Sequence, residues 1–390
     1  MKFTRGITSL QPEGAFVVLA KAKALEAEGK EVIHLEIGQP DFPTPAHIVA
    51  GAKAALDERW THGYTPSLGV MPLRECLAKE LRESRGVDWG PENIVVAPGA
   101  KPVIMAVVQA LVEPGSKVLY PDPGFPSYHS LAAFVGAKGV GIPLVEKDCF
   151  AFDLEVLERE LPGTSLLILN SPQNPTGGVL GREILGRIAE MAVRHDVSVL
   201  SDEVYSRIIY DGTHHSIASF PGMKERTVLV DGLSKTYAMT GWRVGYGAGP
   251  KALIDKLGLY LNNNTSCVNG VAQASAIVAI EGTQEPSQMM FEEFKARRSL
   301  IVDGLNDIDG LSCVLPRGAF YAFPNISQTG KSGKAISDHM LDCGVALLPG
   351  DDFGPAGEGY IRLSYANSQE NISRALGILK EELPKVSSGG

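Results

Sequence analysis

The fold class is decided by two stretches of the chain, Ser165-Leu-Leu-Ile-Leu-Asn-Ser-Pro-Gln-Asn174 and Val197-Ser-Val-Leu-Ser-Asp-Glu203. Each stretch begins with an apolar run of strand length and stops at small or polar residues, a pattern typical of a buried strand. Between the two stretches, residues 182–194 have the apolar spacing of a helix. A strand, a helix and a second strand in this order predict a parallel crossover unit.

The same alternation extends in both directions from this unit. Upstream we expect strands at residues 94–96, 117–120 and 140–144, with a helix over about 101–112. Downstream we expect a strand at residues 228–230. Strands that alternate with helices predict an α/β fold in which the main sheet is doubly wound and mainly parallel.

The pattern changes after about residue 285. A long amphipathic helix over residues 287–305 precedes short strands expected at 312–315, 320–323, 345–348 and 360–363, which predicts a smaller α+β domain. Near the amino terminus, a helix over 14–29 and a strand over 32–37 lead into a proline-rich connector, and helices are expected at 45–58 and 71–85. We therefore expect residues 1–44 to join the small domain, 45–284 to form the large domain and 285–390 to form the small one, with a polar tail at 387–390.

Composition excludes several classes of protein. The 390 residues are 44% hydrophobic, and no apolar run approaches the ~20 residues that a membrane span needs. The formal net charge of −9 argues against general nucleic-acid binding. The five cysteines are widely spread, and neither they nor the eight histidines have metal-ligand spacing, so no metal site is expected. Since the first residues contain no apolar signal core, the protein is expected to be cytoplasmic.

Three polar residues follow buried strands at regular intervals. Asn174, Asp202 and Lys235 are separated by 28 and 33 residues, which are lengths that a crossover helix and its strand occupy. Because the carboxyl ends of parallel strands meet at one edge of a sheet, these side chains are expected to converge there, together with a helix that begins near Gly99. Lys235 has small and apolar neighbours, which favours its neutral, nucleophilic form.

This set of groups is the one that a pyridoxal phosphate site requires. Lys235 supplies an amine for an imine, Asp202 a carboxylate for the pyridine nitrogen, and Arg243 a forked cation suited to phosphate. Asn174 and Tyr205 can donate hydrogen bonds to the phenolic oxygen of the ring. For each residue alone a structural role is the alternative: Asp202 as a helix cap and Tyr205 as a packed core ring.

At this point the sequence resembles the fold type I, class I/II aminotransferases of the aspartate aminotransferase superfamily over residues 10–380. The resemblance rests on five motifs: Ser171-Pro-Gln-Asn-Pro-Thr-Gly177, Ser201-Asp-Glu-Val-Tyr205, Leu233-Ser-Lys-Thr-Tyr-Ala-Met-Thr-Gly-Trp-Arg243, Pro316-Arg-Gly-Ala-Phe-Tyr321 and Tyr360-Ile-Arg-Leu-Ser-Tyr365. It implies an enzyme that moves an amino group between an L-amino acid and a 2-oxo acid through a Schiff base of pyridoxal 5′-phosphate.

The resemblance also assigns roles to individual residues. It implies that Lys235 carries the cofactor with the help of Asp202 and Tyr205, and that the large domain binds it. The remaining cofactor contacts would be Gly99, Ala100, Lys101, Phe125, Asn174, Ser234 and Arg243. The substrate carboxylate would be bound by Arg362, the backbone of Gly38 and Asn174. Tyr64 matches a tyrosine that reaches the cofactor of a partner subunit, so a homodimer with active sites at the interface is implied.

The substrate and the exact reaction are less determined. Lys101 matches a lysine that contacts the distal carboxylate in some relatives, which favours acidic donors such as aspartate or glutamate, although Phe125 and Pro98 depart from that branch. Broad or aromatic specificity, and a Lys101 that serves only phosphate or solvent, stay open. A β-lyase or related synthase on the same fold is the nearer alternative, and a non-catalytic binding or regulatory protein is the remote one.

Overall fold

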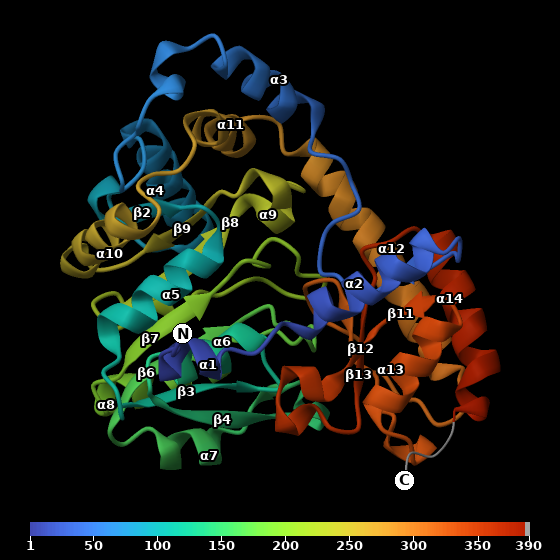
Figure 1. Ribbon diagram of the computed structural model, residues 1–390. Helices are drawn as coiled ribbons and strands as arrows, with labels where there is room; N and C mark the ends of the chain where they lie inside the picture. Colours follow the sequence, from blue (N-terminus) through green and yellow to red (C-terminus); the bar gives the residue numbers. More distant parts are fainter. Residues whose placement is uncertain (387–390) are drawn as a thin grey trace.

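The computed structural model describes residues 1–386 and is organised around one eight-stranded sheet (Figure 1). The strands, in spatial order, are β2 (Ile94–Ala97), β9 (Gly245–Ala248), β8 (Thr227–Gly232), β7 (Ser198–Asp202), β6 (Thr164–Asn170), β3 (Lys117–Asp122), β4 (Lys138–Val145) and β5 (Ala151–Phe152). The five strands from β8 to β4 are parallel, whereas β9 and β5 run antiparallel to their neighbours. The predicted α/β class and mainly parallel sheet are confirmed; the predicted polar tail lies outside the described residues.

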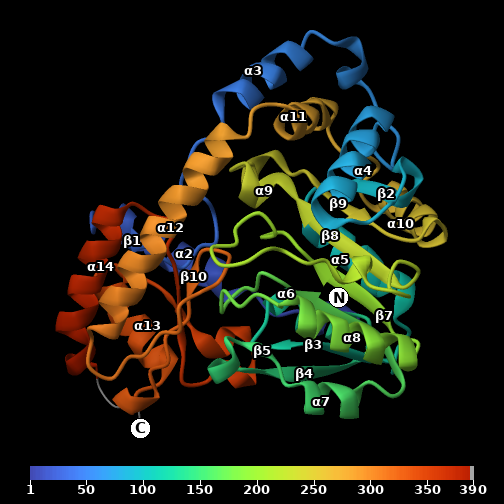
Figure 2. The ribbon, with the colours of Figure 1, turned by 180° about the vertical axis from the view of Figure 1, so that it is seen from behind.

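Helices cover both faces of this sheet (Figure 1, and Figure 2 from behind). On β6, Leu166 and Ile168 pack toward α5 (Ala100–Leu111) and α10 (Lys251–Asn264), while Leu167 and Leu169 pack toward α7 (Leu154–Glu160) and α8 (Arg182–Arg194). Burial on both faces explains why these strands are almost continuously apolar in sequence. Each such leucine stabilises the fold by about 1.5–3 kcal/mol.

Beside the large sheet and its helices, segments from both ends of the chain form a second packed unit, called the second layer below. An antiparallel sheet of β10 (Tyr321–Ala322), β13 (Ile361–Ser364) and β12 (Leu348–Pro349) packs with α12 (Glu285–Asn306), α13 (Gly333–Asp342) and α14 (Gln369–Glu382). Beside it, β1 (Ile33–His34) pairs in parallel with β11 (Val345–Ala346). The remaining helices are α1 (Arg5–Ser9), α2 (Gly14–Ala27), α3 (Ala46–Ala55), α4 (Met71–Arg85), α6 (Pro126–Phe134), α9 (Leu233–Thr236) and α11 (Gly270–Glu281). The domain limits at residues 44 and 284 stay predictions.

Several elements differ from the sequence expectations, and the strand expected at 345–348 is divided into β11 and β12, which belong to different sheets. Residues 312–315 form no strand; Ser312 makes one bridge with Asn325, and the Cys313 N–H donates instead to the side chain of Asn306 at 2.7 Å. The antiparallel strand β9 was not expected, because its glycines hide the strand pattern. Gly245 is required there, since a Cβ would overlap the backbone of Gly99. None of the helices in residues 1–386 is long and apolar enough to cross a membrane.

A buried ionic network connects α4 to the strands that carry the site. The Arg85 guanidinium donates to Asp231, to the Ser206 hydroxyl at 2.6 Å and to Glu80 at 2.9 Å, and it lies 3.4 Å from Glu203. Burial raises the pKa of Asp231 to about 7, and Arg85 opposes that shift. Removing the arginine would leave buried carboxylates without their cation, which is the costly way to break such a network.

We predict that Arg85→Met lowers the free energy of unfolding by about 3–5 kcal/mol, because it leaves buried carboxylates unpaired. Arg82→Met, one turn earlier on α4, is the matched control: its side chain is 57% exposed and pairs with exposed Asp88, so it should cost less than about 1 kcal/mol. Urea denaturation of both variants measures the difference. Equal losses for the two variants would contradict the role assigned to Arg85.

Candidate active site

The amine of Lys235 lies at the carboxyl end of the parallel strands. It belongs to α9, the short helix that follows β8, and its Nζ donates to the carbonyl oxygen of Gly38 at 2.6 Å. Burial, and after it the nearby cations of Arg243, Arg362 and Lys101, lower the pKa of Lys235 to about 8, while Asp202 opposes the shift. At pH 7 roughly a tenth of this amine is therefore neutral. The sequence prediction of a poorly solvated lysine at a strand end agrees with this geometry.

Asp202 and Asn174 reach the same edge from the neighbouring strands. Asp202 ends β7 and is buried; its Oδ2 accepts from the Tyr128 hydroxyl at 2.7 Å, and its Oδ1 has a 3.4 Å contact with the Val204 N–H. Burial raises the pKa of Asp202 to about 6, although Tyr128 opposes the shift. A carboxylate in this setting is stabilised by a cationic N–H donor, which is what a protonated pyridine nitrogen provides.

An anion cradle lies beside Lys235, at the start of α5. Gly99 is the N-cap of α5 with φ +100°, and a Cβ there would overlap the guanidinium of Arg243. Arg243 follows the turn Thr240–Trp242 and donates to the carbonyls of Pro98 (3.2 Å) and Thr240 (3.1 Å). The helix N-terminus and the guanidinium together favour a phosphate. Ala100 and Lys101 begin the helix, and Ser234 precedes Lys235 on α9.

A buried arginine whose hydrogen-bond donors are not all used within residues 1–386 lies between the two layers. Arg362, on β13, is 3% exposed, donates to Asn174 Oδ1 at 3.3 Å and to the carbonyl of Glu36, and stacks 4.7 Å over the Tyr321 ring. Its Nε has no hydrogen-bond partner within residues 1–386. A buried guanidinium that still has an unpartnered N–H is suited to bind a carboxylate.

Two tyrosines close the space around this arginine. The Tyr205 and Tyr321 hydroxyls are 2.6 Å apart. Burial raises the pKa of Tyr321 and raises that of Tyr205 well above its usual value, so both remain neutral donors. Gly38 must be glycine, because a Cβ would overlap the Tyr321 hydroxyl. Sequence reasoning placed Tyr205 here, but Tyr321 and Tyr128 were missed as site residues; Tyr321 ends the motif that begins at Pro316, and Tyr128 lies three residues after Phe125.

Three predicted residues have surroundings that the sequence did not indicate. Phe125 packs edge-on against Tyr128, with ring centroids 5.6 Å apart. The Lys101 ammonium, expected to be available to a ligand, is paired with Glu13, a residue that sequence reasoning did not consider. Tyr64 is 93% exposed in this single chain and is not brought to the site.

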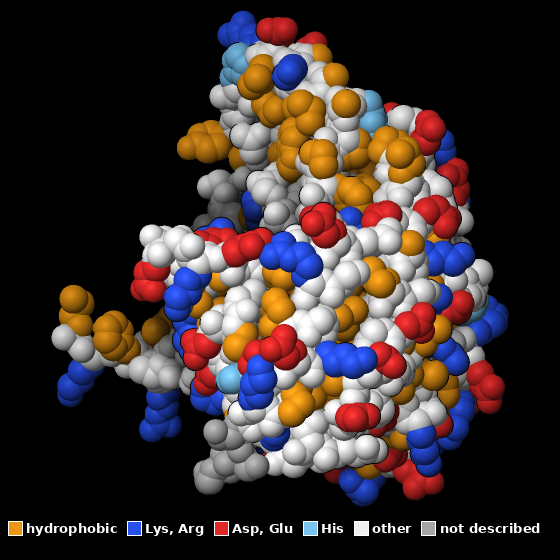
Figure 3. Space-filling model, turned by 90° about the vertical axis from the view of Figure 1, so that its right-hand side faces the viewer, with side chains coloured by type: hydrophobic (Ala, Val, Ile, Leu, Met, Phe, Trp, Pro, Cys, Tyr) orange, Lys and Arg blue, Asp and Glu red, His pale blue; other side chains and the backbone are white. Residues whose placement is uncertain are grey.

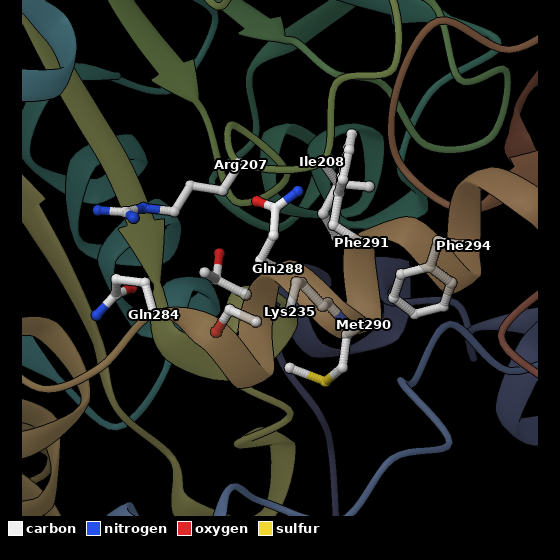
Figure 4. A pocket seen from close by; sticks show the side chains of 10 residues that line it. Arg207, Ile208, Lys235, Gln284, Gln288, Met290, Phe291 and Phe294 are labelled. Carbon is white, nitrogen blue, oxygen red and sulfur yellow. The ribbon is translucent and has the colours of Figure 1, made fainter.

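A cavity of about 250 Å³ borders Lys235 beside this cluster (Figure 4). Figure 4 shows that Gln288, Phe291 and Phe294 line it from α12, while Arg207 lines it from the loop after β7. Asn174, Asp202 and Arg243 are not among its lining residues. The amine thus has space on the side of α12 in addition to the cradle at the start of α5.

Comparison with known proteins assigns the chain to a family. Residues 30–379 match the family model described as Aminotransferase class I and II. The chain belongs to this family. It is an aminotransferase, as the resemblance in the sequence implied, and members of the family typically use pyridoxal phosphate.

Relatives of the class I and II aminotransferases span nearly the whole chain. An aspartate aminotransferase of Pyrococcus abyssi is 42% identical and covers 91% of this chain and 92% of its own. An aromatic-amino-acid aminotransferase of Thermococcus litoralis is 40% identical and covers 92% and 93%. The structure of the aspartate aminotransferase of Thermus thermophilus with maleate is similar with a TM-score of 0.93, at 35% identity, and covers 98% and 99%. Aminotransferases named for acidic and for aromatic substrates are therefore about equally similar to this chain.

We predict that the cofactor-free protein titrates Lys235 near pH 8. Since burial and neighbouring cations disfavour the charged form, the amine should be mostly neutral above pH 8 and lose reactivity about tenfold for each unit below it. Competitive acetylation followed by mass spectrometry measures this, with exposed Lys256 as the reference site. A Lys235 profile that coincides with that of Lys256 would show that the amine is not desolvated.

Proposed function

We propose that this aminotransferase binds pyridoxal 5′-phosphate on Lys235 and moves an amino group between an L-amino acid and a 2-oxo acid in two half-reactions. The observation that carries the proposal is an amine with a pKa lowered to about 8, close enough to a buried carboxylate for Asp202 to affect that pKa. The donor set fits the cofactor: Asp202 would hold the pyridine nitrogen, Asn174 and Tyr205 the ring oxygen. Gly99, Ala100, Lys101, Ser234 and Arg243 would surround the phosphate, with Phe125 against the ring.

When bound, pyridoxal phosphate supplies an electron sink that stabilises negative charge on the α-carbon of the amino acid. The residues of the chain supply binding and proton transfer. Arg362 has an N–H without a partner in the described residues and would bind the α-carboxylate, with Asn174 and the backbone of Gly38 beside it. Lys235, partly neutral near pH 7, can accept the α-proton at Nζ and return it. The Gly38 carbonyl, which accepts from Nζ, orients the amine.

We also propose that the enzyme is a homodimer with active sites at the interface. Large apolar side chains are exposed near the loop that carries Tyr64: Leu56 (57%), Trp60 (42%) and Met71 (49%). Figure 3 shows hydrophobic side chains gathered at the top of one face, over α3. An apolar surface of this kind marks an interaction site, and a second copy would place Tyr64 at the partner's cofactor.

For the reaction, we predict that Lys235→Ala loses at least about 10³-fold in multiple-turnover amino transfer, because both the attachment point and the proton carrier are removed. Added methylamine should restore part of the rate, which a merely structural loss would not allow. Lys256→Ala, at an exposed position of α10, is the control and should keep the full rate. A Lys235→Ala enzyme that turns over at more than a tenth of the normal rate without added amine would overturn the proposal.

For the assembly, we predict that the protein sediments at twice the mass of one chain at micromolar concentration. Trp60→Glu should shift it toward the monomer, since it places a charge in the apolar surface. Val193→Glu, at a side chain that is 40% exposed on α8, should leave the dimer intact. A monomeric wild-type protein in sedimentation velocity would contradict the proposed interface.

A further inference from the structure

Glu13 connects the two layers above the candidate site. It is the N-cap of α2, yet its side chain makes no capping hydrogen bond to that helix. Its Oε1 instead pairs with the ammonium of Lys101 on α5 and accepts from the Ser127 hydroxyl on α6 at 3.2 Å. Because α2 packs on the layer of β11 and β12, this carboxylate is carried from that layer to the helices of the large sheet.

The position of Glu13 is fixed from both sides. Directly after it, Gly14 lies so close to the turn Gly350–Phe353 that a Cβ would overlap the Asp352 carboxylate. Before it, α1 packs against α6, where a Cβ on Gly6 would overlap the carbonyl of Phe134. The Glu13 side chain is only 21% exposed. The packing of the segment on both sides of Glu13 thus holds its carboxylate beside Lys101, whose own side chain is 44% exposed.

Lys101, the cation that pairs with Glu13, also affects the amine of Lys235. Its charge is one of those that lower the pKa of Lys235. Its Nζ also lies 5.1 Å from the centre of the Phe125 ring and 5.9 Å from that of Phe16. The surroundings of Lys101 thus contain one carboxylate, which offsets its charge, and two aromatic rings.

We propose that Glu13 selects the amino donor by occupying Lys101, so that uncharged donors, aromatic ones above all, react in preference to acidic ones. This inference rests on the proposed function and deepens it. An aspartate side chain would have to displace Glu13 from Lys101 and would meet its negative charge, because like charges at short range repel. An uncharged ring leaves the ion pair intact and can pack against Phe125 and Phe16.

The first test is the half-reaction of the cofactor-loaded enzyme with L-aspartate and with L-phenylalanine, followed by the visible spectrum without any 2-oxo acid. The wild type should react more efficiently with phenylalanine. Glu13→Gln should raise the aspartate-to-phenylalanine ratio of second-order rate constants at least tenfold, because it frees the Lys101 ammonium. Glu28→Gln, at the exposed far end of α2, should leave the ratio within twofold. A wild type that prefers aspartate, or an unchanged ratio in Glu13→Gln, overturns the inference.

The second test measures binding without chemistry. Titration calorimetry of the holoenzyme with maleate, a dicarboxylate, should give at least tenfold tighter binding to Glu13→Gln than to the wild type, while 3-phenylpropanoate should change less than twofold. The gain for maleate should vanish in the Lys101→Met background; a gain that persists there overturns the inference. If aspartate and phenylalanine react but their ratio does not respond, only the assignment of Glu13 fails. If no amino acid reacts and Lys235 carries no cofactor, the proposed function fails instead.

Discussion

The structure depends on keeping one amine poorly solvated at the end of a buried strand. Lys235 follows β8 and donates to the Gly38 carbonyl, and burial together with the nearby cations lowers its pKa to about 8. An exposed lysine would be almost fully charged near neutral pH and would be a weak nucleophile. The parallel sheet supplies the rigid edge on which this amine stands, and the buried network around Arg85 holds β7 and β8 together beneath it.

The site is completed by segments from outside the large sheet. Gly38 comes from the connector near the amino terminus, and Arg362 comes from β13 near the carboxyl terminus. Their meeting places the Arg362 guanidinium near the amine, as the effect of Arg362 on the Lys235 pKa indicates. Glu13 adds a third contact between the layers, and it brings a negative charge to the Lys101 ammonium. In the proposed function, cofactor attachment and side-chain selection would thus depend on different parts of the chain.

Local patterns in the sequence predicted much of this arrangement, and non-local contacts account for what was missed. Apolar runs that stop at Asn170, Asp202 and Gly232 predicted parallel strands, and parallel strands share one edge, so the sequence predicted that Asp202 and Lys235 would lie near each other. The pairing of Glu13 with Lys101 spans 88 residues and leaves no periodic signal. The hydrogen bond from the Tyr128 hydroxyl to Asp202 likewise joins distant parts of the chain and leaves no periodic signal. The strand expected at 312–315 failed because a side chain, that of Asn306, satisfies the backbone there.

The central claim, that Lys235 is the residue to which the cofactor attaches, has one direct test. The purified protein would be reconstituted with pyridoxal 5′-phosphate, reduced with borohydride, digested, and its peptides mapped by mass spectrometry. The account predicts a yellow holoprotein and a single stoichiometric pyridoxyl group on Lys235. A label on another lysine, or a preparation that stays colourless after reconstitution, would contradict it.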